Sequence, residues 1–476
     1  MAYAPSALPP SRRGWLFAAL GAAAAAAGMW SARGFSIDDA LIEARVAHHI
    51  ASGIGYRFNP DGAIVDCVTP LGWAYVLALG AKAGVWQALS FARALGATSW
   101  LCAAALLGAW SAARTSGYRR FIVPLALGVC LPLSAWAVSG LETSFIVLLA
   151  TLALVPNLWG AAAAGLAGAL RPELVPWAVV STFGSAWARR APLRERALCL
   201  ASALVPALGV AVVRALVFER AAPLAVLAKP SDFAHGLRYA WGALAFGGPV
   251  YLLVAFRAWR GLEPRFGAIA AASAVHFVVL LGVGGDWMPL WRLALPVFPG
   301  LLLLGAYLAE RSTTLPNAAR LLAVGLAAAL LYWFKGEDVR GVLAQRERMA
   351  GELPALLGDA RRIATLDVGW VAAASGRHVV DLSGVTDEDV ALLPGGHTSK
   401  RLPRDFLRRR DVDALVLLLA GRWQPGHGSI QTREAWREAE RRVLELDGAD
   451  TFSAVGRIAL TPERDYVVLR RKPESP

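Results

Sequence analysis

The feature that most constrains this chain is a series of apolar segments, each about long enough to cross a lipid bilayer. The six clearest are residues 14–30, 95–113, 121–138, 197–216, 266–283 and 290–308. A membrane-spanning helix needs about 20 mostly apolar residues, and a helix satisfies its own backbone hydrogen bonds in lipid. Hydrophobic residues make up 56% of the chain, far more than in most soluble domains. The sequence therefore predicts a polytopic α-helical membrane protein.

The basic residues predict the orientation of these segments. The formal net charge of +13 is concentrated in short loops such as "WARRAPLRER" and "RTSGYRR", as in the cytoplasmic loops of membrane proteins. This distribution argues against nucleic acid as a partner and predicts membrane lipids as the surroundings. With Arg12 and Arg13 inside, the count reaches about eleven spans and an extracytoplasmic C-terminus. It requires residues 68–86, which contain one Pro and three Gly, to form an interfacial or re-entrant helix.

The composition changes at Lys335. The segments "RIATLDV", "HVVDLSG", "DALVLLLA", "TFSAVGRIAL" and "DYVVLRRK" are typical of strands, and "REAWREAERRVLEL" is typical of an amphipathic helix. We therefore expect residues 1–334 to form a transmembrane domain, with a first outer loop at 33–94. Residues 335–476 are expected to form an extracytoplasmic α/β domain of ordinary size. The four cysteines match neither a disulfide framework nor a zinc pattern.

Four clusters of ionisable residues are predicted on the outer side of the membrane. They are Asp38 with Asp39, Glu142, Arg171 with Glu173, and Asp286 with Arg292. Charged groups at membrane depth are costly unless they pair or line an aqueous cavity. Since the orientation follows from the basic loops alone, the presence of all four clusters on one side favours a shared polar pocket.

Each cluster also has a structural interpretation. Ser36 could cap a helix that contains the acidic pair, and Glu142 could simply begin a helix. Arg171 and Glu173 could form a buried ion pair, and "GGDWMP" could be a tight turn between two spans. The residues alone leave these alternatives open.

The segment after the acidic pair is predicted to form an amphipathic helix suited to the membrane surface. Ile42, Val46 and Ile50 share one face of it. His48 and His49 are adjacent and point to different faces, so we expect no metal site from them.

The clusters fit one kind of chemistry. A carboxylate can act as general base on a hydroxyl acceptor, and arginines can hold a phosphate through bidentate contacts. Together they fit glycosyl transfer from a polyprenyl-phosphate sugar, in which a single displacement inverts the anomeric configuration. The donor needs no nucleotide fold, and the chain has no P-loop, G-x-G-x-x-G or G-x-S-x-G motif.

Several motifs resemble those of a known superfamily. "DDALIEARVAHHIASGIGYRFNPDGAIVDCVTPLGW" resembles the first outer loop of the GT-C membrane glycosyltransferases. It is most similar to the terminal arabinofuranosyltransferase-like family of mycobacteria and its bacterial relatives. "SGLET", "LRPE" and "GGDWMP-x-x-R" resemble three further motifs in the same order, and "LDVGWVAAASGRHVVDLSGVTD" resembles the family's extracytoplasmic domain. The resemblance extends from about residue 36 to residue 387.

The resemblance implies an inverting transferase in the bacterial inner membrane, with a polyprenyl-phosphate sugar as donor and a cell-envelope glycan or lipid as acceptor. It implies that Asp38 or Asp39 is the general base. The implied pocket residues are Arg45, Arg171 and Arg292 for the donor phosphate, with Glu142, Glu173 and Asp286 as pocket acids.

Departures from the family pattern leave the sugar and the acceptor open. Leu41 replaces a usual aromatic residue, and Gly72 replaces a usual tryptophan. The motifs identify no cofactor, and whether a divalent cation assists is also open. Two alternatives are a flippase for lipid-linked sugar and a non-catalytic membrane protein of envelope assembly. Transporters commonly contain repeated halves, and no internal repeat is evident here.

Overall fold

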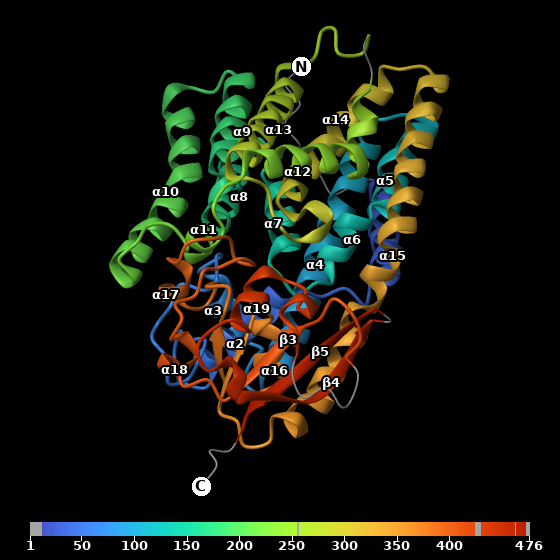
Figure 1. The fold of residues 1–476 in the computed structure, drawn as a ribbon. Coiled ribbons are helices and arrows are strands. Elements are labelled where there is room, and N and C mark those ends of the chain that lie inside the picture. Colours follow the sequence, from blue (N-terminus) through green and yellow to red (C-terminus); the bar gives the residue numbers. More distant parts are fainter. Residues whose placement is uncertain (1–11, 255–256, 424–429, 462, 473–476) are drawn as a thin grey trace. The chain divides into compact units, whose positions relative to one another are not determined.

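The computed structural model describes residues 12–254, 257–423, 430–461 and 463–472 (Figure 1). The chain forms two compact units, and each is assembled from three separate segments. The first unit comprises Met1–Phe35, Ala92–Val213 and Ser231–Arg340, and the second comprises Ser36–Phe91, Arg214–Pro230 and Gly341–Pro476. Most of the expected first outer loop is therefore grouped with the C-terminal domain rather than with the apolar helices.

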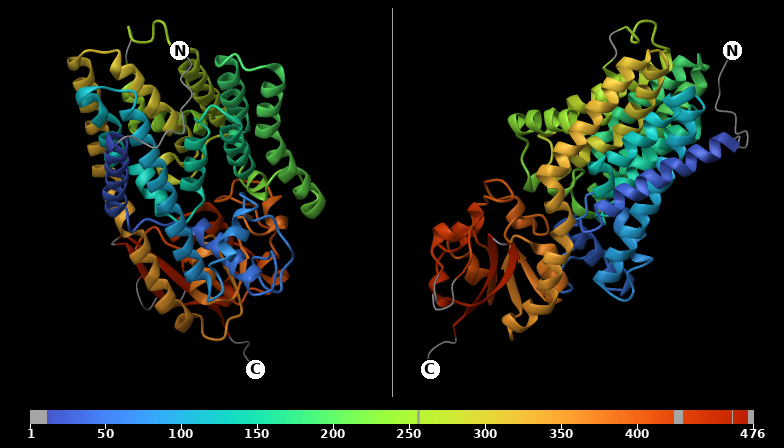
Figure 2. Two further views of the ribbon diagram at one scale, coloured as in Figure 1. Left: turned by 180° about the vertical axis from the view of Figure 1, so that it is seen from behind. Right: turned by 90° about the vertical axis from the view of Figure 1, so that its right-hand side faces the viewer.

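The first unit is helical. Its elements are α1 (Arg12–Ser31), most of α4 (Val85–Ala112), η1 (Gly117–Phe121), α5 (Ile122–Val129), α6 (Leu131–Ala137), α7 (Thr143–Leu152), α8 (Leu158–Leu170), η2 (Pro172–Leu174), α9 (Val175–Ala188), most of α10 (Leu193–Phe218), α12 (Phe233–Phe246), η3 (Pro249–Leu253), α13 (Pro264–Val283), η4 (Pro289–Val297), α14 (Phe298–Glu310) and the first part of α15 (Thr314–Leu357). Figures 1 and 2 show α12 running across the long helices rather than along them.

Six helices in the described residues are long and apolar enough to cross a membrane. A seventh span results if the pair Gly117–Val129 and Leu131–Ala137, bent by 58°, is counted as one. The apolar helices α7 and α8 are shorter than a full span. The helices are compatible with a membrane-embedded protein, and the count of about eleven spans stays a prediction.

Small residues allow the helices of this unit to pack closely. A Cβ atom on Gly21 of α1 would lie 2.3 Å from the backbone oxygen of Ala104 in α4. A Cβ atom on Gly108 would lie 2.2 Å from the backbone oxygen of Phe17. Close backbone approach of this kind is typical of helix packing in membranes, where apolar burial alone does not drive association.

The second unit contains a five-stranded mixed sheet in the order β2-β1-β3-β5-β4. Strand β1 pairs in parallel with β2 and β3, whereas β5 pairs antiparallel with β3 and β4. Its elements are α2 (Asp38–Ala51), α3 (Trp73–Ala78), α11 (Leu224–Ala228), β1 (Arg362–Thr365), α16 (Val368–Ser375), β2 (His378–Asp381), α17 (Glu388–Ala391), α18 (Phe406–Arg409), β3 (Ala414–Leu418), η5 (Thr432–Glu434), α19 (Glu438–Val443), η6 (Ala449–Thr451), β4 (Phe452–Thr461) and β5 (Arg464–Arg471).

All five expected strand segments contain a strand, but two helices differ from expectation. Helix α15 continues past the expected domain boundary at Lys335 as far as Leu357. Helix α19 is shorter than predicted because Ala435 pairs with Leu419 in a β-bridge, so the chain before it is extended. The segment 68–86 contributes only the six residues of α3 and the start of α4.

Helix α2 is not an amphipathic surface helix. It packs against α3 and α16, and Glu43, Arg45 and His49 are buried along with its apolar residues. Ile37 occupies the N-cap position without a side-chain capping hydrogen bond. The capping pattern read from Ser36 is therefore not the one that begins this helix.

Candidate functional site

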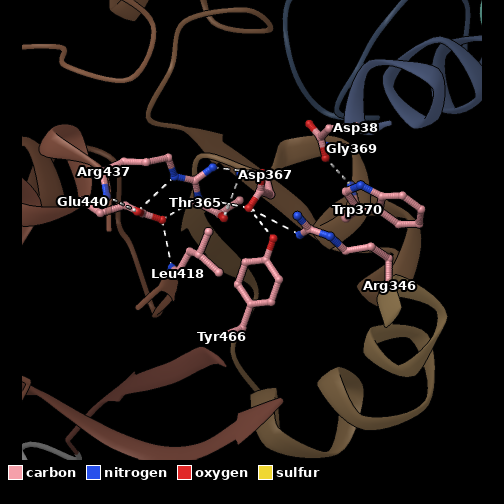
Figure 3. Close-up of polar contacts among 10 residues, drawn as sticks. All are labelled: Asp38, Arg346, Thr365, Asp367, Gly369, Trp370, Leu418, Arg437, Glu440 and Tyr466. Carbon is pink, nitrogen blue, oxygen red and sulfur yellow. Dashed lines mark hydrogen bonds and ion pairs between the residues drawn. The ribbon is translucent and has the colours of Figure 1, made fainter. Parts of the chain in front are cut away.

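The acidic pair lies at the first turn of α2, and its two members have different environments. The Oδ2 atom of Asp38 accepts a hydrogen bond from the N–H of Gly369 at 3.0 Å, and Oδ1 accepts one from the N–H of Trp370 at 2.8 Å (Figure 3). These are the second and third residues of α16, where backbone N–H groups have no partner within the helix. Asp38 therefore caps α16 from another part of the chain.

Glycine is required for this contact. A Cβ atom on Gly369 would lie 2.1 Å from the backbone oxygen of Asp38, far inside van der Waals contact. The start of α16 can approach α2 this closely only because position 369 has no side chain.

A buried charge network surrounds the same end of α16. Nη1 and Nη2 of Arg437 each donate to one oxygen of Asp367 at 3.0 Å, and the hydroxyl of Tyr466 also donates to it (Figure 3). Nη1 of Arg346 lies 3.6 Å from the same carboxylate. Both oxygens of Asp367 are thus used by residues of the second unit.

The protonation of Asp38 follows from this neighbourhood. Removal from solvent and the negative charge of Asp367 raise the pKa of Asp38 to about 8, although the two backbone N–H groups oppose the shift. Burial also disfavours ionisation of Asp367, but the charges of Arg437 and Arg346 lower its pKa overall. Near neutral pH, Asp38 retains its proton and both its oxygens are engaged, so it is a poor general base.

Asp39 has a more open environment. Its side chain is 31% exposed, and its Oδ2 atom lies 4.0 Å from Nζ of Lys229. Among the described residues this loose ion pair is its one side-chain polar contact. Asp39 therefore keeps acceptor capacity for further hydrogen bonds.

Arg45 is buried, and its guanidinium group donates hydrogen bonds to backbone carbonyls. Its Nε donates to the carbonyl of Phe58 at 2.7 Å, and Nη1 and Nη2 donate to the carbonyls of Ala372 and Arg377, each at 2.8 Å. These bonds connect α2 with the loop before α3 and with the end of α16. They favour a positioning role for Arg45 over the phosphate-binding role that the resemblance implies.

The two adjacent histidines also contact backbone carbonyls. Nδ1 of His48 lies 2.9 Å from the oxygen of Ala81, and Nδ1 of His49 lies 2.7 Å from that of Arg57. Within the part of the chain that the structure describes, no group of three His, Cys, Asp or Glu residues could hold a metal ion.

In the first unit, Arg171 joins two of the predicted pocket acids. Its Nε donates to Oε1 of Glu142 at 2.6 Å, and its Nη1 lies 3.8 Å from Oε1 of Glu173. Arg171 directly follows α8 and Glu142 directly precedes α7, so this ion pair joins the ends of two short apolar helices. Glu142 is fully buried, and its Oε2 atom has no hydrogen-bond partner among the described residues.

Asp286 and Arg292 form the second buried ion pair of this unit. Nε of Arg292 donates to Oδ2 of Asp286, and the guanidinium lies 5.7 Å from the centre of the Trp136 ring. The segment "GGDWMP" is not a tight turn but an irregular stretch that leads into η4. Leu290 and Trp291 have φ values of 61° and 49°, a left-handed conformation that costs energy in residues with a side chain.

These clusters lie close together in the first unit. The charges of Asp286, Arg292 and Arg171 all act on the hydroxyl of Tyr239, which accepts a hydrogen bond from the N–H of Leu293 at 2.9 Å. Helix α13 packs against both η2 and η4, and α7 packs against η4. The structure thus gathers three of the four predicted clusters. Asp38, Asp39 and Arg45 belong to the second unit, and one chamber for all eight residues stays a prediction.

Sequence reasoning missed the residues that distinguish the two aspartates. Gly369 lies in the recognised segment "LDVGW", but nothing local connects it with a carboxylate 331 positions earlier. Lys229 lies in a polar loop without a motif, and Arg437 lies in a segment read as an ordinary amphipathic helix.

Comparison with known proteins covers only the C-terminal part. Residues 338–467 match the family model of a domain of unknown function, DUF8728. No curated protein and no solved structure matches the chain. The matched segment contains the whole sheet except the second half of β5, together with Gly369 and Trp370, the capping partners of Asp38.

Proposed function

We propose that the chain is an inverting glycosyltransferase of the bacterial inner membrane. It transfers a sugar from a polyprenyl-phosphate donor to a hydroxyl of a cell-envelope glycan or lipid on the outer side. The observation that carries the proposal is Asp39, a partly exposed carboxylate with free acceptor capacity at the start of an otherwise buried helix. The ordered motifs that resemble the GT-C superfamily support it.

In the proposed reaction, Asp39 removes the proton of the acceptor hydroxyl as its oxygen attacks the anomeric carbon. The new carbon–oxygen bond forms on the face opposite the leaving group. The bond between the anomeric carbon and the phosphate oxygen breaks, and polyprenyl phosphate leaves with the bonding electrons. The step is neither an oxidation nor a reduction.

Arg171 and Arg292 are the proposed phosphate ligands. Each already pairs with a carboxylate, but a guanidinium has five N–H donors and can bind a second anion beside the first. Glu142, Glu173 and Asp286 keep the two arginines oriented. The Oε2 atom of Glu142, which has no partner among the described residues, is available to accept from a sugar hydroxyl. Arg45 is left out because its donors bind three carbonyls.

The test is donor turnover by purified protein in detergent, measured with a polyprenyl-phosphate sugar and an envelope extract as acceptor. We expect wild type to consume donor and Asp39→Asn to lose at least about 100-fold in rate, the usual contribution of a general base. The thermal unfolding midpoint should be unchanged, because the side chain of Asp39 makes only one loose ion pair with the described residues.

Asp38→Asn is the matched control at the adjacent position. The variant should keep the wild-type rate of sugar transfer. It should have a lower unfolding midpoint, because only one atom of an amide group can accept a backbone N–H bond, whereas both oxygens of Asp38 do so. Full activity of Asp39→Asn would overturn the proposed base. Sugar movement across proteoliposomes without any donor consumption in detergent would favour the flippase alternative.

A further inference from the structure

One end of the first unit is strongly basic. Arg114 follows α4, Arg189 and Arg190 follow α9, and Arg194 and Arg196 lie in the first turn of α10. Further arginines are at the start of α13 and after α14, namely Arg265 and Arg311. Arg265 donates to the carbonyl of Leu154, just after α7, and Arg311 donates to that of Arg260, before α13.

Three of these arginines lie close enough for their charges to interact. Arg114 and Arg189 both act on Arg265, and Glu263 is the one carboxylate that acts on it there. Helix packing brings Arg189 and Arg265 together. Helices α9 and α13 lie against each other, and a Cβ atom on Gly184 would lie 2.8 Å from Cβ of Ala268. Gly184 lies just before the end of α9 and Ala268 lies just after the start of α13, so Arg189 and Arg265 are brought together.

The three guanidinium groups have spare donors. Nη1 of Arg114 donates to the carbonyl of Trp110, Nη2 of Arg265 donates to that of Leu154, and Nη1 of Arg189 donates to Oε1 of Glu195, each at 2.8 Å. Each guanidinium has five N–H donors, so most of them have no partner among the described residues. Three guanidinium groups beside the two carboxylates Glu195 and Glu263 leave a net positive charge, and their unused donors favour an anion that carries several acceptor oxygens.

An exposed aromatic surface adjoins this cluster. Trp187 and Phe183 of α9 are 60% and 42% exposed, and the guanidinium of Arg196 lies 4.6 Å from the centre of the Trp187 ring. The neighbouring α10 is the least buried of the long apolar helices, with 11% of its apolar window covered. Aromatic side chains beside basic ones are typical of the boundary between lipid tails and headgroups.

We propose that Arg114, Arg189 and Arg265 form a binding site for the headgroup of an anionic phospholipid. Phosphate oxygens accept hydrogen bonds from the three guanidinium groups, and the acyl chains lie along Phe183 and Trp187. Basic pockets between membrane helices bind anionic headgroups by this combination of charge and apolar contact. The site is independent of sugar transfer and lies at helix ends other than those that carry Glu142, Arg171 and Asp286.

The experiment titrates delipidated protein in detergent with phosphatidylglycerol or phosphatidylcholine and measures the thermal unfolding midpoint. We expect stabilisation by phosphatidylglycerol, with Arg114→Gln and Arg265→Gln each weakening its apparent affinity about fivefold. Arg194→Gln is the matched control, because Arg194 is an exposed arginine at the same end but outside the cluster. It should leave the affinity nearly unchanged. Inorganic phosphate at equal ionic strength should stabilise much less than the lipid.

Three outcomes would overturn the proposal. Equal stabilisation by the two lipids would exclude headgroup recognition, and an equal loss in Arg194→Gln would show diffuse charge attraction without a site. Full stabilisation by inorganic phosphate alone would identify a free-anion site. If the Arg114 and Arg265 variants do not fold, Arg189→Gln replaces them, because the side chain of Arg189 is 32% exposed.

Discussion

Two buried carboxylates that pair with arginine, Asp367 in the second unit and Glu142 in the first, differ in how fully their oxygens are hydrogen-bonded. In the second unit, both oxygens of Asp367 receive hydrogen bonds, from Arg437 and Tyr466. In the first unit, Glu142 shares one oxygen with Arg171, and its Oε2 has no partner in the part of the chain that the structure describes. Buried polar atoms are nearly always bonded, and the exceptions need an explanation. The difference indicates a structural network around Asp367 and is consistent with the binding role proposed for Glu142.

Matched amide substitutions test this difference directly, and we expect the largest effect at Asp367. Asp367→Asn should destabilise the second unit by about 3 kcal/mol or more, because it leaves Arg437 and Arg346 without a full counter-charge. Glu142→Gln should cost only about 1–2 kcal/mol, because the amide keeps an acceptor for Arg171 and Glu173 remains nearby. Hydrogen exchange in β1 and β3, and in α7 and α8, measures the two effects separately.

Activity should follow the opposite order. Glu142→Gln should reduce sugar transfer by more than its stability loss explains, because its free oxygen is the one proposed to meet substrate. Asp367→Asn should reduce activity only to the extent that the folded fraction falls. Equal stability losses at the two positions, or an unchanged rate in Glu142→Gln, would remove the distinction between the networks.

A second comparison concerns close contacts rather than charges. Gly369→Ala should destabilise the second unit by about 1–3 kcal/mol, because the added methyl group would overlap the backbone of Asp38. Gly351→Ala is the control within the same unit. Gly351 lies inside α15, and no described atom lies within 4 Å of the place that an added methyl group would take. This change should therefore stabilise the unit by about 0.5–1 kcal/mol. Thermal unfolding in detergent distinguishes the expected loss of stability in Gly369→Ala from the expected gain in Gly351→Ala. A neutral Gly369→Ala would show that α2 and α16 can separate without cost.

The two comparisons explain how much could be predicted from the sequence. The apolar helices were predictable because a helix that crosses a bilayer needs about 20 mostly apolar residues, and such segments are evident in the sequence. The five strand segments were predictable from short runs of β-branched and apolar residues such as "HVVD" and "ALVLL". The gathering of Glu142, Arg171 and Asp286 was predictable too, because each lies at the end of an apolar helix.

The rest depends on contacts between distant positions. Asp38 caps a helix 331 residues away, a contact without any local pattern. The burial of α2 was missed for the same reason: its charged residues look like a solvent face until Phe58, Ala372 and Arg377 supply carbonyls for Arg45. The role of Lys229 beside Asp39 is likewise set by tertiary structure alone.

A further expected effect is the pH dependence that Asp38 contributes to stability. Its pKa is raised to about 8 in the folded protein from 3.8, so between these values the folded state holds a proton that the unfolded state releases. Stability should therefore fall as pH rises through this window, by at most about 1.4 kcal/mol per pH unit. Asp38→Asn lacks this titration, so the gap in unfolding midpoint between wild type and the variant should narrow from about pH 5 to about pH 8. Asp39→Asn should keep most of the wild-type dependence, because the charge of Asp39 is the smallest of the causes that shift the pKa of Asp38. If the difference in unfolding midpoint widened with pH instead, Asp38 would be held as a carboxylate. It would then again be a candidate for the general base.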